Sequence, residues 1–157
     1  MSSNEFLNNE IKKIISDKKM EAPVNQAMAG AYVMGHFKGI NLKILDLRST
    51  SGIADLFVLG SANNHTQAAA MAEEISKQMR DNGFEAISRE GLKQSTDWIL
   101  LDYGDIIFHI FLESSRYVYD LDNLYSKATN IEIPEEYYYS DAATTTRPVG
   151  DDGRGYF

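Results

Sequence analysis

Hydrophobic residues recur every three or four positions in three segments of the chain, and this period predicts three amphipathic helices. The segments are residues 4–20, residues 23–37 and a third that follows a cap at Asn63 or Asn64 and ends at Asn82-Gly83. Pro23 suits the first turn of the second helix. The apolar positions of that helix, which we expect to be buried, are Ala27, Ala31 or Tyr32, Met34 and Phe37.

Shorter apolar segments between these helices predict β-strands. They cover residues 41–47, 53–61, 84–90, 97–102 and 105–111. Residues 53–61 are apolar on both faces, which is typical of a central strand, and residues 113–129 predict one or two short helices. Interleaved helices and strands predict the α/β class: a single layered domain with a mixed, about five-stranded sheet flanked by helices.

The ends of the chain differ in character from its middle. Residues 1–22 predict an N-terminal helical extension, and residues 23–133 the α/β domain. The segment 134–157 is acidic, is rich in Gly, Thr, Asp and Pro, and has no apolar period. We expect this tail to be largely disordered, because it has too few apolar residues to bury.

The segment "WILLDYGDIIFHIF", residues 98–111, predicts a β-hairpin with Tyr103-Gly104 as a two-residue loop. In that register Asp102 faces Asp105, Leu100 faces Ile107 and Trp98 faces His109. One side of the hairpin is uniformly apolar and predicts the core face; it holds Ile99, Leu101, Ile106, Phe108 and Ile110. The Trp98 side is mixed, so it lies either under a helix or open as an interaction patch.

The facing aspartates of this hairpin have two interpretations. Like charges placed opposite each other disfavour strand pairing. Asp102 and Asp105 therefore either bind a cation or a basic side chain, or accept hydrogen bonds from turn amides, which is the commoner role of Asp in turns.

Composition narrows the function classes. The chain has 157 residues, no cysteine and a net charge of −8. The three histidines are not at ligand spacing, so we expect no metal and no cofactor. The negative charge disfavours binding to phosphates, so we expect little direct RNA contact. It either fits a basic protein partner or only confers solubility. No apolar run is long enough for a membrane span and no secretory signal is visible, so the expected location is the cytoplasm.

Enzyme chemistry finds little support in the sequence. Gly60-Ser61, between a predicted strand and a predicted helix, is typical of a nucleotidyltransferase site, but such a site also needs a carboxylate pair for magnesium. The only such pair, Asp120 and Asp122, lies in a predicted helix, where positions two apart do not share a face. His109 is too far along its strand from Asp105 for acid–base work. We expect no catalytic residue.

Several motifs, in order, resemble the ribosomal silencing factor family, also called Iojap-related proteins. They are "ILDLRSTSGIADLFVLGS" (44–61), Glu90-Gly91, Trp98, "LLDYGDIIFHIF" (100–111) and "RYVYDLDNLY" (116–125). The resemblance covers about residues 24–130. Two stretches depart from the family pattern: "ANNHTQ" (62–67) replaces a Gly-Thr-Ser-x-Arg-like turn, and Asp122 and Tyr125 replace Glu and Trp.

The resemblance implies a nucleotidyltransferase-like fold without the catalytic carboxylates. It also implies binding to the large ribosomal subunit through ribosomal protein L14, a block of subunit joining, and repression of translation under nutrient limitation. The implied L14-binding residues are Trp98, Leu100, Asp102, Tyr103 and Asp105, with Glu90, His109, Arg116 and Tyr119 as second-rank candidates. Arg116 has a structural alternative, as a bridge from the last helix to a carboxylate.

Two other functions stay open on the sequence alone. One is a biogenesis factor of the large ribosomal subunit, and the other, less favoured, is a divergent nucleotidyltransferase. A homodimer through the hairpin face of the free protein also stays open.

Overall fold

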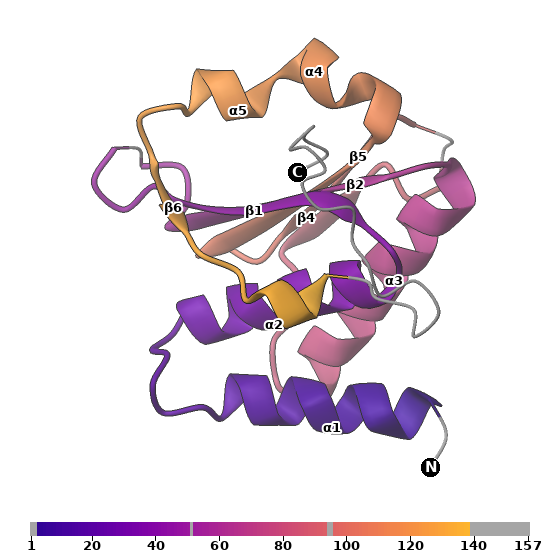
Figure 1. Cartoon of the computed structure of the whole chain (residues 1–157), viewed down its shortest axis with the longest axis vertical. Helices are drawn as coiled ribbons and strands as arrows, with labels where there is room; N and C mark the ends of the chain where they lie inside the picture. The colour runs from indigo at the N-terminus through magenta and orange to yellow at the C-terminus, as the bar shows by residue number, and fades with distance from the viewer. Residues whose placement is uncertain (1–2, 51, 94–95, 139–157) are drawn as a thin grey trace.

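The computed structural model describes residues 3–50, 52–93 and 96–138. They form a six-stranded mixed sheet between two layers of helices (Figure 1). The elements in chain order are α1 (Ser3–Ile15), α2 (Val24–His36), β1 (Ile40–Asp46), β2 (Leu56–Ala62), α3 (His65–Asp81), β3 (Ser88–Glu90), β4 (Trp98–Asp102), β5 (Ile106–Leu112), η1 (Glu113–Ser115), α4 (Arg116–Tyr119), α5 (Leu121–Leu124), β6 (Thr129–Ile131) and η2 (Glu135–Tyr137).

The strand order across the sheet is β3-β4-β5-β2-β1-β6. The central strands β2 and β5 run parallel, and the other neighbouring pairs are antiparallel. Every residue of β2 is buried, which confirms the central position predicted from its apolar residues on both faces. The α/β class and the mixed sheet are confirmed, with one strand more than expected.

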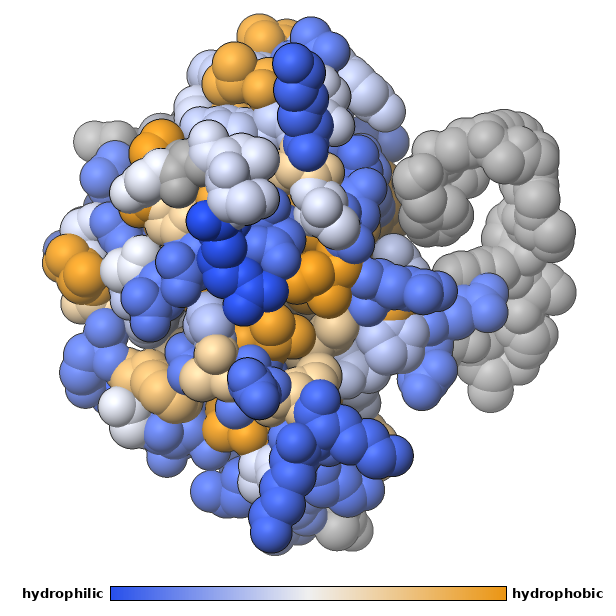
Figure 2. Space-filling view, turned by 90° about the vertical axis from the view of Figure 1, so that its left-hand side faces the viewer, coloured by the Kyte–Doolittle hydropathy of each residue, from blue (hydrophilic) through white to orange (hydrophobic). Residues whose placement is uncertain are grey.

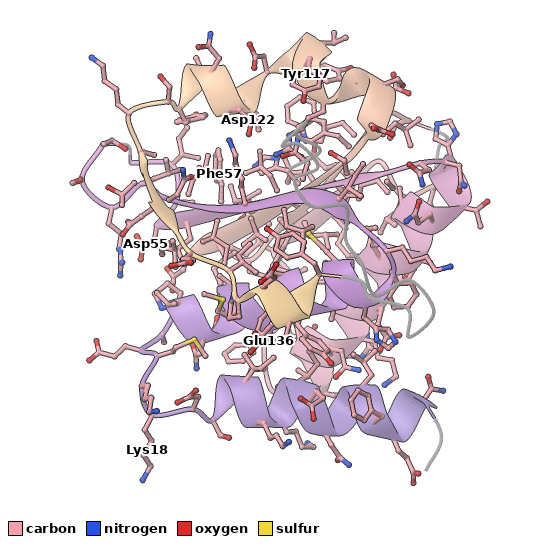
Figure 3. The ribbon with its side chains drawn as sticks, in the orientation of Figure 1. Lys18, Asp55, Phe57, Tyr117, Asp122 and Glu136 are labelled. Carbon is pink, nitrogen blue, oxygen red and sulfur yellow. The ribbon has the colours of Figure 1, made fainter. Side chains whose placement is uncertain are left out.

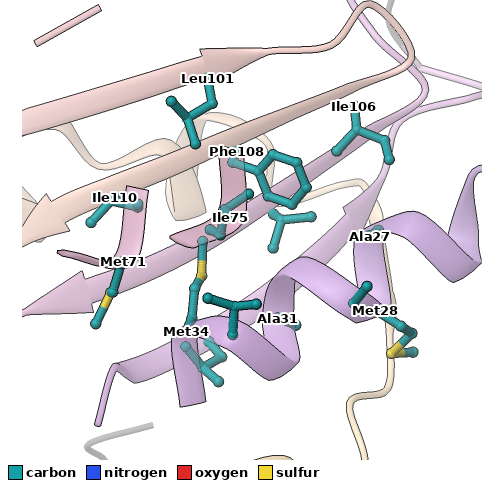
Figure 4. Packing of buried hydrophobic residues seen from close by; sticks show 14 of the residues in the cluster. Ala27, Met28, Ala31, Met34, Met71, Ile75, Leu101, Ile106, Phe108 and Ile110 are labelled. Carbon is teal, nitrogen blue, oxygen red and sulfur yellow. The ribbon is translucent and has the colours of Figure 1, made fainter. Parts of the chain in front are cut away.

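The first helical layer is the larger one and covers most of one face of the sheet. Its core joins α1, α2 and α3 to side chains of β2, β4 and β5, and Figure 4 shows this packing around Phe108. In α2 the buried residues extend around most of the helix rather than along one stripe. The reason is that α1 packs on α2 from outside while the sheet packs on it from inside, as Figure 1 shows.

The second helical layer is smaller. It consists of the single turns α4 and α5, which lie across the opposite face of the sheet (Figure 1). Its core contains Leu121 from α5 and Phe57, Leu59 and Phe111 from the strands. In Figure 3, Phe57 lies between the sheet and α5. The expected short helices are confirmed, and the unexpected strand β6 follows them.

The β4–β5 hairpin differs from its predicted register. Trp98 pairs with Phe111, Leu100 with His109 and Asp102 with Ile107, a slip of two residues from the predicted pairs. The last strand pair is Asp102 with Ile107, so residues 103–106 connect the paired strands, and within this turn the Tyr103 N–H donates to the Ile106 carbonyl (2.9 Å). The predicted pairing of Asp102 with Asp105 is therefore wrong, and the predicted strands at 53–61 and 84–90 begin later, at Leu56 and Ser88.

The ends of the chain are only partly described. Residues 139–157, most of the predicted tail, lie outside the described residues. Before them, Tyr137 packs edge-on against Tyr32 of α2, with ring centroids 5.1 Å apart. Among the described residues, no helix has the length and apolar character that crossing a bilayer requires.

Candidate functional site

The two sides of the hairpin keep the residues that the sequence assigned to them. Side chains alternate along a strand, so a slip of two residues leaves each side chain on its predicted face. Trp98, Leu100 and Asp102 therefore share the face of His109 and Phe111, beside the α4–α5 layer. Ile99, Leu101, Ile106, Phe108 and Ile110 lie in the core under α2 and α3, as predicted.

Trp98 is partly exposed and is held by aromatic neighbours. Its Nε1–H donates a hydrogen bond to His109 Nδ1 (3.1 Å). Its ring lies 5.0 Å from the Phe111 ring and 4.7 Å from the Tyr119 ring, centroid to centroid. The hydrogen bond and the two ring contacts thus fix the indole, while part of its surface stays accessible. This arrangement is suited to a rigid interface anchor.

His109 is a buried support for this indole and has no surface of its own to offer a partner. It is 3% exposed, and its Nδ1 accepts the Trp98 hydrogen bond, which requires the proton of the neutral ring on Nε2. Burial, together with the nearby Arg116 charge, lowers the pKa of His109 to about 3. Within the described ranges its Nε2 has no hydrogen-bond partner. The imidazole is neutral at neutral pH and positions Trp98.

Arg116 is also buried, at 1% exposure, and its guanidinium is fully engaged. Nε donates to Asp122 Oδ2 (2.8 Å), Nη2 to Asp122 Oδ1 (3.1 Å) and Nη1 to Ser61 Oγ (2.7 Å). Asp122 also pairs with Lys43 Nζ at 2.9 Å and lies on the sheet side of α5 (Figure 3). Arg116 therefore ties α4 to α5 and to β2, and Asp122 ties α5 to β1 through Lys43. This bridge to a carboxylate is the structural role that the sequence left open for Arg116.

The pKa of Asp122 reports this network. Burial alone would raise it, but the hydrogen bonds and charges of Arg116 and Lys43 outweigh burial and lower the pKa to about 2.

Ser61 and Asp122, two groups of the hypothetical nucleotidyltransferase site, are both engaged by Arg116. Asp120 lies apart, as the left-handed residue between α4 and α5. In the part of the chain that the structure describes, no three His, Asp or Glu side chains are grouped to hold a metal.

An open strip remains where the short α4–α5 layer ends. We define the docking strip as Glu90, Trp98, Leu100, Asp102 and Tyr119. Trp98, Leu100 and Asp102 are partly exposed on β4. Glu90 pairs with Leu100 across β3 and β4 and therefore points to the same side. Tyr119, 44% exposed, borders the strip from α4. Two apolar anchors beside two carboxylates fit a basic protein surface.

The structure separates two other predicted residues from this strip. Tyr103 points to the opposite face, where its ring packs edge-on against Phe108 at 5.7 Å. Asp105 is exposed at the turn. Asp102 Oδ1 accepts the Gly104 amide (2.8 Å), which confirms the turn-amide interpretation for Asp102.

Exposed apolar residues on α4 and α5 are a feature that the sequence analysis did not identify. Tyr117, Val118 and Leu124 are 70%, 76% and 69% exposed. Figure 2 shows hydrophobic residues at the upper end of the molecule, at the height of α4 and α5 in Figure 1. Each helix is a single turn, too short for a hydrophobic period to indicate which residues face out. Tyr117 and Val118 directly precede Tyr119, whose ring contacts Trp98, so they lie on the same short helix as the residue that borders the docking strip.

Comparison with known proteins places this geometry in a family. The family model described as "Ribosomal silencing factor during starvation" matches residues 19–152. The chain is 34% identical over 89 residues to the ribosomal silencing factor of Halalkalibacterium halodurans, covering 57% of this chain and 75% of that protein. It is 33% identical over 110 residues to the chloroplastic Iojap protein of Zea mays, covering 69% of this chain and 46% of that protein.

A solved structure agrees with these matches. The crystal structure of a Bacillus halodurans protein superposes with a TM-score of 0.59 at 26% identity, over 72% of this chain and all of that chain. The two relatives above are named as a ribosomal silencing factor and an Iojap protein, and a relative from Mus musculus, 28% identical over 75 residues (46% of this chain, 32% of that protein), is named "Mitochondrial assembly of ribosomal large subunit protein 1". The chain belongs to the ribosomal silencing factor family.

Proposed function

We propose that this protein represses translation by docking on ribosomal protein L14 of the large subunit and blocking the approach of the small subunit. The partner and the block come from the family resemblance. The observation that carries the proposal for this chain is the docking strip, where Trp98 is held rigidly and left partly exposed.

The strip has the parts of a protein–protein interface. A fixed indole loses little conformational entropy on binding, and a flanking leucine adds apolar area to bury. Glu90 and Asp102 lie at the rim, where carboxylates speed the encounter with a basic partner and select against acidic ones. The net charge of −8 acts in the same direction.

Steric blockade needs no chemistry from the protein itself. The buried groups that could serve a reaction are committed: His109 to Trp98, and Ser61 and Asp122 to Arg116. We therefore propose a binding protein rather than an enzyme, acting by the space it occupies.

The direct test is binding of the purified chain to isolated L14, with Leu100→Arg as the variant. A positive charge on the strip should repel a basic partner and weaken binding by about tenfold or more, which is 1.4 kcal/mol. Ile87→Arg is the matched control, because Ile87 is also an exposed apolar residue near the same sheet edge but lines the opposite side. Equal loss in both variants, or no binding of the unmodified chain, contradicts the proposal.

A subunit-joining assay tests the second half of the proposal. Large subunits incubated with the chain should form fewer assembled ribosomes when small subunits are added, and Leu100→Arg should restore joining. Binding to L14 without any effect on joining would instead favour the biogenesis factor left open by the sequence. Sedimentation of the protein with translating ribosomes would contradict the blockade.

A further inference from the structure

A polar cavity lies on the far side of the same sheet edge, beside α3. Its volume is about 760 Å³, within the usual range for ligand sites. Residues of α3, residues 84–89 and 91–93, and Tyr103 line it. Arg89 points into this side because it pairs with the core-facing Leu101, whereas its neighbour Glu90 points to the docking strip. The cavity and the strip are therefore on opposite faces of the edge.

Three cationic side chains line this cavity in a chain whose net charge is −8: Arg80, Arg89 and Lys93. Among the described residues, no ion pair engages Arg80 or Lys93. Arg89 contacts Glu73 at 3.4 Å, but both side chains are more than a third exposed, so this pair is weak and Arg89 can turn to another anion at little cost. Glu85, the second carboxylate of the cavity, leaves a net positive balance.

Hydroxyl groups complete the polar lining. Ser76 of α3 is buried at 6% exposure and lines the cavity. Its Oγ has no hydrogen-bond partner of good geometry within the described ranges, although it lies near enough to Tyr103 to influence that phenol. Burial is the larger effect and raises the pKa of Tyr103, which keeps the phenol protonated as a donor. The Ser76 and Tyr103 hydroxyls, beside several cations, can each turn a hydrogen toward an anionic oxygen.

We infer that this cavity is a binding site for a phosphate group, held by Arg80, Arg89 and Lys93 with Ser76 and Tyr103 as hydroxyl donors. Arginine presents paired N–H donors that match phosphate oxygens, and lysine adds a point charge. The phosphate has two sources with the same chemistry, the backbone of an RNA or a free nucleotide. The sequence disfavours RNA contact through the net charge, but the local field at a cavity is set by the groups that line it.

The test uses the full chain and needs no ribosomal protein, so it stands apart from the docking experiment. Binding of a short labelled RNA is followed by fluorescence anisotropy, and binding of ATP and of inorganic pyrophosphate by calorimetry. The variant is Arg80→Glu with Lys93→Glu. The matched control is Lys18→Glu with Lys19→Glu, which makes the same charge change at exposed positions of the α1–α2 connection, and Lys18 lies at the far end of the molecule in Figure 3.

We expect the cavity variant to weaken binding by about tenfold or more and the control pair to change it little. RNA binding without ATP binding identifies a backbone phosphate, and ATP binding identifies a free nucleotide. Thermal unfolding of both variants checks that each is folded. The inference is overturned if none of the three probes binds saturably, or if both variants weaken binding equally, since the latter result would mark a general charge effect.

Discussion

The two faces of the sheet are built differently. The face under α2 and α3 is covered by helices of 13 and 17 residues, and most of its buried side chains are apolar, with Ser76 and Gln78 of α3 as buried polar residues. The face under α4 and α5 is covered by two helices of four residues each, and it carries His109, Trp98 and the Arg116–Asp122 pair. The first face supplies stability through burial, and the second combines a buried ion pair with a partly exposed Trp98.

The short second layer is the physical cause of the difference. Two single turns cover β1, β2 and β5 and reach β4 through Tyr119, so Trp98 and Leu100 are only partly covered. Single turns are also unstable by themselves and need specific contacts to hold them. The Arg116–Asp122–Ser61 network supplies such contacts, which explains why a buried charge occurs on this face.

The largest expected effect on stability belongs to the apolar face. Phe108→Ala should lower the free energy of unfolding by about 3–5 kcal/mol, because the ring is fully buried and packs directly on Gly30 of α2. Urea unfolding measures this change. At temperatures where the variant is folded, its affinity for L14 should be unchanged, and a large loss of affinity would mean that the two faces are not separate in role.

Arg116→Met tests the support on the other face. We expect a loss of about 3 kcal/mol in the free energy of unfolding, near the lower end for a broken buried pair, because Asp122 keeps Lys43 as a partner. Urea unfolding again gives the value. Arg48→Met is the control: it removes an exposed pair with Asp46 and should have little effect. Equal stability of the two variants would show that the buried network contributes nothing.

Trp98→Ala should weaken binding more than it lowers stability, the reverse of what we expect for Phe108→Ala. Binding to L14 should weaken by about 2 kcal/mol or more, roughly thirtyfold, as for an interface anchor, with a smaller loss of stability because the indole is partly exposed. Calorimetry with L14 and urea unfolding together separate the two roles. Unchanged affinity with a large loss of stability would identify Trp98 as a core residue instead.

The most specific prediction concerns the pH dependence of the free energy of unfolding, which His109→Gln should change. Between its ordinary unfolded pKa of about 6.5 and the folded value of about 3, the unfolded chain binds a proton that the folded chain does not. The free energy of unfolding therefore falls as the pH drops below 6.5, by up to about 1.4 kcal/mol per pH unit.

Glutamine keeps an acceptor for Trp98 but does not titrate. The part of the pH dependence of the free energy of unfolding that comes from His109 should therefore disappear in the variant. Urea unfolding at pH 7, 6 and 5 compares the two proteins. The same slope in both would contradict a neutral buried His109.

The sequence predicted the faces of the hairpin better than its register. The side-chain period of two assigned Trp98 and Phe108 to the correct sides, and a slip of two residues leaves this assignment intact. The turn itself depended on the Asp102 carboxylate, which accepts the Gly104 amide, and on the left-handed Gly104 (φ +86°). Residue patterns do not show which turn amide a carboxylate will accept.

Long-range contacts were the other missing information. The extent of burial in α2 follows from the packing of α1 on its outer side, which no local period of α2 encodes. The partners of Arg116 lie on β2 and α5 and are 55 and 6 residues away along the chain. Strand β6 has only three residues and becomes a strand by pairing with β1, so its own composition gives little indication of its structure.

Arg116 and Tyr119 share one turn of helix, and that turn joins the inside of the protein to its outside. Arg116 bonds to Ser61 and Asp122, while the Tyr119 ring packs against Trp98. A partner that binds the Trp98 indole and Tyr119 should therefore also reduce the motion of residues 113–125, because ordering one end of so short a helix orders the other. If so, amide hydrogen exchange at β6, which the partner does not contact, should be slower in the complex than in the free protein.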